Sequence, residues 1–173
     1  GERDMRKPII VGNWEMNKTM KETKEFMEAV DAAAASENAV FGIGAPYTAL
    51  SAAVAGAKNL VIAAENCHWE DSGAFTGEIS VPMLQEVGVT HCIIGHSERR
   101  EMFNDTNETV NKKAKRLIDA GITPILCIGE TEAQYDAGDS EKVIRDQLTG
   151  SLADMCPKCV GNMVIAYEPI WAI

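Results

Sequence analysis

The sequence predicts an α/β fold built on a parallel sheet, and two observations carry that prediction. Short apolar runs alternate along the chain with longer segments of helical period. The runs are nearly continuous in hydrophobicity, which is typical of strands that are covered on both faces. Six strands are expected, at residues 8–13, 40–45, 60–64, 91–95, 123–128 and 163–167.

The segments between these runs have the spacing of amphipathic helices. Apolar residues recur one turn apart over residues 20–34 and again over residues 110–118. Asp105 is expected to open the second of these helices with a capping box, and Gly121 to end it. Ser140 is expected to cap a further helix. Shorter helices fit residues 48–55 and 80–87, which gives five connecting helical segments.

Strict alternation of strand and helix gives parallel strands joined by right-handed crossovers. Two architectures satisfy it, an open doubly wound sheet and a (β/α) barrel. A glycine-rich dinucleotide fingerprint after the first strand would favour the doubly wound sheet. The segment from Gly12 to Asn17 contains no G-x-G-x-x-G, which weakens that alternative.

The composition excludes several classes of function. The 173 residues include 16 Lys and Arg against 26 Asp and Glu, a formal charge of −10, which argues against nonspecific binding to nucleic acid or anionic membranes. No apolar run approaches the roughly 18 residues of a membrane span, and no signal pattern is present. We therefore expect a soluble, cytoplasmic protein. Residues 1–5 are expected to be a leftover of cloning followed by the start of the protein, and to lie outside the fold. Residues 6–173 are expected to form one domain.

The cysteines predict neither a disulfide framework nor a metal site. They are five in number, and three of them, Cys67, Cys92 and Cys127, lie in apolar or strand-like stretches. Cys156 and Cys159 form a Cys-x-x-Cys without a second ligand pair at zinc spacing. We therefore expect reduced thiols next to a turn, and no metal.

Polar residues follow most of the apolar runs, where parallel α/β folds place their chemistry. One edge of the sheet is therefore expected to gather a histidine, several carboxylates and two amides, which suits proton transfer. The residues in question are Asn13, Glu15, Glu65, Asn66, His96, Ser97, Glu98, Glu130 and Glu168.

His96 and Glu168 are the most informative of these residues. His96 follows Ile93-Ile94-Gly95 directly, and an imidazole at a helix N-terminus is favoured in its neutral form. A neutral imidazole can donate a hydrogen bond to a carbonyl, although a strand-end histidine can equally be satisfied by local backbone. Glu168 closes an apolar strand before Pro169, and partial desolvation there would make the carboxylate a stronger base. Taken alone, it could also be a salt-bridged side chain.

Several multi-residue motifs, in the same order along the chain, resemble the triose-phosphate isomerase family. The match runs from about Arg6 to the last residue. The motifs are Gly12-Asn13-Trp14-x-Met16-Asn17-Lys18, Gly73-Ala74-Phe75-Thr76-Gly77-Glu78, Ile94-Gly95-His96-Ser97-Glu98-Arg99-Arg100, Cys127-Ile128-Gly129-Glu130 and Ala166-Tyr167-Glu168-Pro169-x-Trp171-Ala172-Ile173.

The resemblance implies a fold and a reaction. The fold would be an incomplete (β/α)8 TIM barrel of six parallel strands, and the reaction the interconversion of dihydroxyacetone phosphate and glyceraldehyde 3-phosphate in glycolysis and gluconeogenesis. In the family's mechanism, which comes with the resemblance, Glu168 is the base, His96 the neutral electrophile and Asn13 a ligand of the enediolate oxygens. Glu98 would support the site. No cofactor or metal is implied.

The resemblance also implies a lid and a partner. Pro169, Ile170 and Trp171 would begin the mobile lid loop. Thr76 would reach the active site of a partner subunit in a homodimer. The substrate would be a small phosphorylated triose, and neither nucleic acid nor a membrane is an expected partner.

Two departures from the family pattern predict impaired activity, and a third difference is milder. Glu15 occupies the position of a catalytic lysine that binds the anionic groups of the substrate, and would face Glu98. A whole barrel needs about 250 residues, whereas this chain stops after six strands, without the units that cradle the substrate phosphate. Glu65 stands where the family usually has glutamine, a milder difference.

Three hypotheses on function remain. The first is a family chain that is catalytically dead or nearly so in this truncated Glu15 form. The second is a self-associating structural module, a homo-oligomer formed through exposed strand edges or the loop around Thr76. The third is an enzyme completed by a separate chain that carries the last two β/α units.

Overall fold

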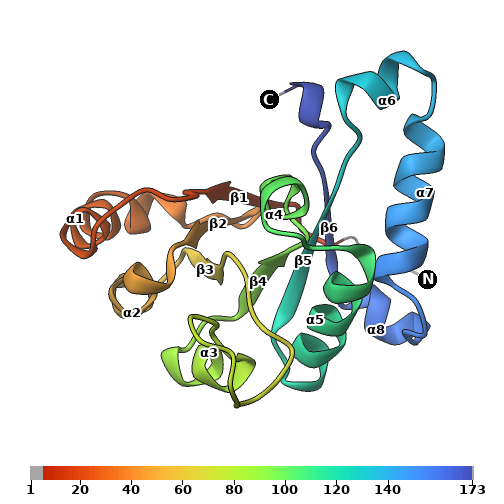
Figure 1. The fold of residues 1–173 in the computed structure, drawn as a ribbon. Coiled ribbons are helices and arrows are strands. Elements are labelled where there is room, and N and C mark those ends of the chain that lie inside the picture. Colours follow the sequence, from red (N-terminus) through yellow and green to blue (C-terminus); the bar gives the residue numbers. More distant parts are fainter. Residues whose placement is uncertain (1–5, 173) are drawn as a thin grey trace. The chain divides into compact units, whose positions relative to one another are not determined.

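The computed structural model describes residues 6–172 and contains a sheet of six strands that follow one another in chain order (Figure 1). The expected remnant at residues 1–5 and the last lid residue, Ile173, lie outside the described residues. The strands are β1 (Ile9–Asn13), β2 (Val40–Ala45), β3 (Val61–Ala64), β4 (His91–Ile94), β5 (Thr123–Ile128) and β6 (Val164–Tyr167).

Helices separate all of these strands, so the expected alternation of strand and helix is confirmed. There are also two short 3₁₀ turns. The first, η1 (Asp31–Ala34), extends α1, and the second, η2 (Ile170–Ala172), follows β6. The helices are α1 (Met20–Val30), α2 (Tyr47–Gly56), α3 (Val81–Val87), α4 (Ser97–Met102), α5 (Asn107–Asp119), α6 (Glu132–Asp136), α7 (Ser140–Ser151) and α8 (Pro157–Gly161).

The chain divides into two compact units. The first contains the described residues up to Glu65 together with Leu84–His91, and the second contains Asn66–Met83 and the described residues from Cys92 onward. In the first unit β1, β2 and β3 are parallel, with Ile9 opposite Val40 and Gly42 opposite Val61. In the second unit β5 and β6 are parallel, with Ile125 opposite Val164.

Apolar helix faces build the core of the first unit. α1 packs on α2, and Met27, Leu50 and Ala53 are buried at these helices. The Asp31 carboxylate closes the end of the α1 segment by accepting the backbone N–H groups of Lys58, Asn59 and Leu60. Burial opposes ionisation of this carboxyl, but the three backbone donors outweigh it and hold the pKa of Asp31 below its ordinary value.

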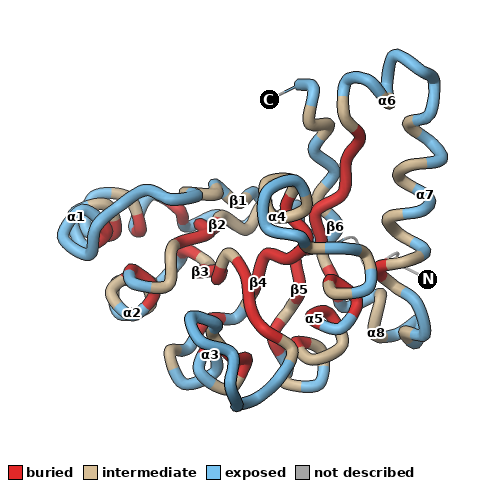
Figure 2. The backbone as a smooth tube through the Cα atoms, in the orientation of Figure 1, coloured by how far each residue is buried: buried red, intermediate tan, exposed pale blue. Residues whose placement is uncertain are grey.

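In the second unit, α5 packs against α7 and β5 (Figure 1). The expected stripe of α5 is confirmed, since Val110, Ala114 and Leu117 are fully buried. Figure 2 shows β5 almost entirely buried, whereas β6 alternates between half-buried and exposed residues.

Two predicted helix starts were wrong by one residue. Thr106, not Asp105, caps α5 in a capping box with Thr109, because the Asp105 carboxylate pairs with Arg99 and Lys113 instead. Asp139 occupies the cap position of α7, and the Ser140 hydroxyl donates to Glu130. The separate short helices α6 and α8 were not predicted, since neither is long enough to show a period.

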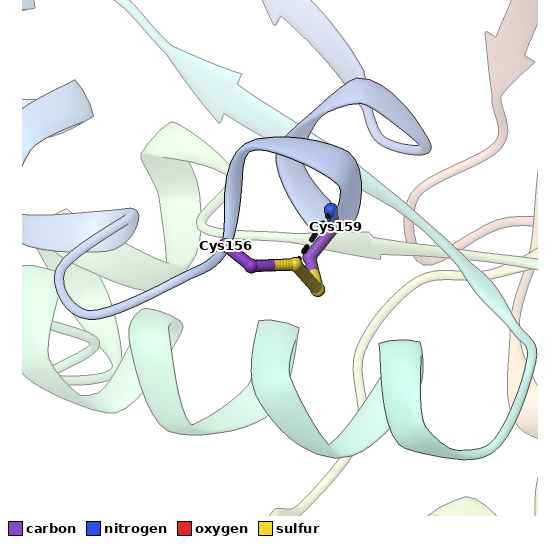
Figure 3. Close-up of a disulfide and its surroundings, with 2 residues drawn as sticks. All are labelled: Cys156 and Cys159. Carbon is purple, nitrogen blue, oxygen red and sulfur yellow. Dashed lines mark hydrogen bonds between the residues drawn. A yellow bond between two sulfur atoms is a disulfide. The ribbon is translucent and has the colours of Figure 1, made fainter.

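The expectation of reduced thiols at Cys156 and Cys159 is contradicted. The two side chains form a disulfide at the start of α8, with their Cα atoms 5.1 Å apart (Figure 3). The one-turn helix brings residues three apart onto one face, within the Cα separation that a disulfide requires. Cys67, Cys92 and Cys127 are free and buried.

Candidate active site

His96 stands where β4 ends and α4 begins, in the second unit. Gly95 turns the chain between the two elements with a φ of 69°, and a Cβ there would lie 2.8 Å from the Arg100 guanidinium. His96 is the N-cap of α4, and its Nδ1 atom accepts the backbone N–H of Glu98 at 3.2 Å. An Nδ1 atom that accepts a hydrogen bond carries no proton, so the ring is neutral with its proton on Nε2.

The Glu98 carboxylate offers a competing arrangement for the same ring nitrogen. Its Oε2 atom lies 3.7 Å from Nδ1 of His96, which would be an ion pair only if Nδ1 were protonated. The backbone N–H of Glu98 already occupies that nitrogen at a shorter distance, and the Glu98 side chain is 43% exposed. We therefore assign the neutral ring, and Glu98 holds it through its main chain.

Glu168 follows β6 directly, and its backbone continues the pairing of β5 with β6. Its N–H donates to the carbonyl of Ile128 at 2.9 Å, and the N–H of Ile170 donates to the carbonyl of Glu130 at 2.9 Å. Gly129 lies against this segment so closely that a Cβ there would collide with the Glu168 carbonyl. The position of the Glu168 backbone therefore depends on the absence of a side chain at residue 129.

The two predicted catalytic side chains meet in the second unit. Nε2 of His96 lies 3.8 Å from Oε2 of Glu168. Only 11% of the His96 side chain is exposed, against 53% of the Glu168 side chain. About half of the Glu168 side chain is therefore covered, which agrees with the prediction of partial desolvation, and β6 itself alternates between half-buried and exposed residues.

The Arg100 side chain connects the ends of β4 and β5 through hydrogen bonds. Its guanidinium donates to the carbonyls of Gly95 at 2.7 Å and Cys127 at 3.4 Å, and to the Asn107 amide oxygen at 2.7 Å. Burial lowers the pKa of Arg100. Burial, and then the nearby Glu168 carboxylate, raise the pKa of Cys127 to about 12, so that thiol is inert at neutral pH.

Glu130 holds the predicted lid segment. Its buried carboxylate accepts hydrogen bonds from the Tyr167 hydroxyl at 2.8 Å, the Trp171 indole at 3.2 Å and the Ser140 hydroxyl at 3.1 Å. Burial opposes its ionisation, but these donors and its own backbone outweigh burial and lower the pKa of Glu130. The hydrogen bond between the Tyr167 hydroxyl and Glu130 raises the pKa of Tyr167. Residues from Ile170 to Ala172 form η2.

Sequence reasoning named Glu130 as a strand-end carboxylate but gave it no role, and it missed Arg100 and Gln147. The Gln147 amide pairs with both backbone groups of Gly129, accepting at 2.8 Å and donating at 3.2 Å. The signal for Arg100 was present in the motif that carries His96. Gln147 lies on α7, far from any strand end, and nothing in the sequence pattern pointed to it.

Two other predicted site residues belong to the first unit. Asn13 ends β1, and its side-chain oxygen accepts the backbone N–H of Glu15 at 3.3 Å. Glu15 is exposed and has a left-handed backbone with a φ of 58°. Strain of this kind costs about 1–3 kcal/mol in a residue other than glycine and concentrates at functional sites. Thr76, in the second unit, is exposed in a turn that the Glu78 N–H closes on the Phe75 carbonyl.

A small cavity of about 20 Å³ lies beside Glu168, which is room for about one water molecule. A cavity of this size does not enclose a small-molecule ligand. Between residues 6 and 172, no three His, Cys, Asp or Glu side chains are grouped as metal ligands. None of the helices in this part of the chain has the length and apolar character to cross a membrane.

Comparison with known proteins agrees with the fold and the motifs. The family model for triosephosphate isomerase matches residues 8–173. The chain is 50% identical to the triosephosphate isomerase of Alkaliphilus metalliredigens over 171 residues, which is 98% of this chain and 69% of that protein. It is 48% identical to that of Streptococcus gordonii, covering 97% of this chain and 68% of that protein.

A solved structure gives the same result for the fold. The crystal structure of triosephosphate isomerase from Bartonella henselae superposes with a TM-score of 0.88 at 38% sequence identity. The match covers 96% of this chain and 69% of that one. The predicted fold class, an incomplete TIM barrel of six parallel strands, is thereby confirmed.

Proposed function

Because the chain belongs to the triosephosphate isomerase family, we propose that His96 and Glu168 are the proton-transfer pair of a triose-phosphate isomerase site. The reaction is the interconversion of dihydroxyacetone phosphate and glyceraldehyde 3-phosphate. The observation that carries the proposal is the separation of 3.8 Å between His96 Nε2 and Glu168 Oε2. A base and a hydrogen-bond donor at this spacing can act on adjacent atoms of one small substrate.

Each residue has a role that follows from its chemistry. The Glu168 carboxylate takes a proton from the carbon next to the substrate carbonyl, and the Nε2–H of His96 donates a hydrogen bond to the carbonyl oxygen as negative charge develops there. Glu168 then returns the proton to the neighbouring carbon. The former carbonyl oxygen gains a proton and the neighbouring hydroxyl loses one, which completes the exchange of aldehyde and ketone. By its place in the family motif, Asn13 is a further proposed site residue. Glu98 is a positioning residue, since its N–H fixes the His96 tautomer.

Glu15 is the main reason to expect low activity. It occupies the position of a lysine in the family motif, where a cation would stabilise the anionic substrate and the developing enediolate. A unit charge pair about 4 Å apart at an effective dielectric of about 20 is worth about 4 kcal/mol. The loss of that attraction alone corresponds to about a thousandfold in rate. We propose that a polypeptide of these 173 residues turns over substrate poorly or not at all.

Phosphate binding gives a second reason for low activity. Barrels of this type commonly bind phosphate at the loops after the seventh and eighth strands, whereas these residues contain six strands. An added polypeptide that carries the last two β/α units of a family member should therefore raise turnover. The test is an isomerase assay on the purified chain, with and without that fragment. Saturable turnover at ordinary enzyme rates by the chain alone would contradict the proposal.

A second candidate function is self-association through the strand edges, which exposed apolar side chains on β1 and β6 favour. Ile10 is 55% exposed and Ile165 is 41% exposed. Unpaired strands with exposed apolar residues tend to pair with another chain. Light scattering over a range of concentrations tests this proposal, together with an Ile165→Lys variant. A monomer at every concentration would rule it out, and so would an oligomer that both Ile165→Lys and Ile10→Lys leave intact.

The proposed lid and the proposed dimer contact both lie in the second unit. Pro169, Ile170 and Trp171 form the lid in this proposal, and the bonds from Tyr167 and Trp171 to Glu130 hold one position of it. The exposed turn that contains Thr76 is proposed to contact a second subunit. Replacing Thr76 with Arg should lower the subunit affinity without unfolding the chain, which sedimentation would detect.

A further inference from the structure

The Cys-Pro-Lys-Cys segment carries chemistry that the proposed isomerase does not use. Cys156 and Cys159 are joined in a disulfide at the first turn of α8 (Figure 3). Cys156 is exposed and Cys159 is half-buried. The Sγ atom of Cys156 accepts the backbone N–H of Cys159 at 3.0 Å. The pair therefore lies at the surface, and the Sγ atom of the more exposed residue already has a polar partner.

The other three cysteines of the chain are poorly suited to thiol–disulfide exchange. Cys67, Cys92 and Cys127 are all buried. Burial, and then the hydrogen bond with Cys67, raise the pKa of the Cys92 thiol well above its ordinary value. Burial also raises the pKa of Cys127 to about 12. Because the thiolate is the reactive form, sulfur exchange in the folded chain is confined to the exposed pair.

We propose that Cys156 and Cys159 form a two-electron thiol–disulfide exchange site, and that exchange begins at Cys156. A thiolate of an external dithiol attacks Sγ of Cys156, the bond to Cys159 breaks, and Cys159 leaves as a thiolate that takes a proton from water. The second thiol of the reagent then attacks its own sulfur in the mixed disulfide and releases Cys156. The reagent ends as a disulfide, and the protein gains two electrons and two protons.

Local structure favours Cys156 as the first sulfur. It is the more exposed of the two residues, so an external thiolate can reach it more readily. In the reduced state the Cys159 N–H can donate to a Cys156 thiolate, which suits Cys156 to attack an external disulfide in the reverse direction.

The helix turn is built to survive reduction. The Val160 N–H donates to the Cys156 carbonyl at 3.0 Å, and the Met163 N–H donates to the Val160 carbonyl at 3.0 Å. Neither bond involves sulfur. Met163, immediately before β6, is 2% exposed and anchors the segment in the core. The two thiols therefore stay close after reduction, and the exchange is reversible.

Alkylation of the folded chain followed by mass spectrometry tests the site. Iodoacetamide should label neither Cys156 nor Cys159 before reduction and both of them after mild treatment with dithiothreitol. The three buried cysteines are internal controls that should react only in denaturant. Reduction by glutathione as well as dithiothreitol supports the proposal and indicates a monothiol partner, whereas reduction by dithiothreitol alone supports it and indicates a dithiol partner. Labelling before reduction, or resistance to both reagents until the chain is denatured, would overturn the proposal.

Two variants test the order of attack. Cys159→Ser leaves Cys156 as the exposed thiol, and Cys156→Ser leaves Cys159. With oxidised glutathione, Cys159→Ser should form the mixed disulfide at least about tenfold faster, because its remaining thiol belongs to the more exposed residue and can accept the backbone N–H of position 159 as it becomes charged. Equal rates, or faster reaction of Cys156→Ser, would contradict the assignment of Cys156. All of these measurements are independent of isomerase activity, so the site and the proposed function can fail separately.

Discussion

Nε2 of His96 lies 3.8 Å from Oε2 of Glu168, although the two residues are 72 positions apart in sequence, 168 minus 96. The distance is set by backbone, since Arg100 binds the carbonyls at the ends of β4 and β5, and β5 pairs with β6 up to Glu168. The separation is too long for a direct hydrogen bond. It leaves each side chain able to face a substrate atom.

Replacing Glu15 with Lys should increase turnover strongly only when the phosphate-binding units are also supplied. In the chain alone we expect a gain of less than about tenfold, because phosphate binding would still be lacking. With the fragment that carries the last two units, the gain should approach a thousandfold, which is about 4 kcal/mol. Glu25→Lys, an equal change of charge at an exposed position of α1, is the matched control. Full recovery from Glu15→Lys without the fragment would show that the phosphate units matter less than proposed.

The His96 ring should be the neutral Nε2–H tautomer in the free protein at neutral pH. Long-range ¹H–¹⁵N NMR distinguishes this tautomer, because an unprotonated Nδ1 resonates far from a protonated one. His68 is an internal reference, since its Nδ1 accepts the Glu70 N–H at 2.9 Å in the same way. A proton on Nδ1 of His96 would contradict the assignment and would place the Glu98 carboxylate, not its N–H, against the ring.

Gly129→Ala should destabilise the chain by about 3 kcal/mol or more. The added Cβ meets the Glu168 carbonyl, which is backbone and cannot move aside as a flexible side chain would. Gly161→Ala is the matched control in the second unit, because a Cβ there meets nothing within 4 Å. It should change the free energy of unfolding by less than about 1 kcal/mol. Urea unfolding of both variants makes the comparison, and equal stabilities would mean that the β5 and β6 ends are further apart.

The Glu130 network should make stability depend on pH in the acid range. Its folded-state pKa lies below the ordinary value of 4.5, so its contribution is present above that value and is lost as the pH falls through the folded-state pKa. Glu130→Gln should lower the free energy of unfolding at pH 7 by about 1.5–3 kcal/mol, the worth of hydrogen bonds to a charged group. The difference should vanish near pH 2. Glu132→Gln, at an exposed position, is the control, and a difference that does not change with pH would refute the ionised form of Glu130.

Much of the fold was predictable because apolar runs, and the glycines at the ends of helices, are local signals in the sequence. The ranges predicted for β2 and β5 match the observed strands, and each remaining strand agrees within one residue at either end. The wrong prediction for the N-cap of α5 had a different origin. The Asp105 carboxylate forms ion pairs with Arg99 and Lys113 and does not cap the helix. Such a choice between partners depends on tertiary contacts, and no local pattern records it.

The proximity of His96 and Glu168 was predictable, and the catalytic roles of the two residues stay predictions. The strand-end rule and the family motifs pointed to His96 and Glu168, and the distance between them agrees with that prediction. The disulfide at Cys156 could not be inferred, because it depends on packing and chain geometry around the residue. The roles of Asn13, Glu15 and Glu98 stay predictions.

The most direct test of the proton-transfer pair is the isomerase assay on the Glu15→Lys chain completed by the two-unit fragment, with and without Glu168→Gln. The account predicts measurable turnover of glyceraldehyde 3-phosphate that Glu168→Gln lowers by about a thousandfold or more, because the amide cannot accept the proton. Turnover that Glu168→Gln leaves unchanged would contradict it.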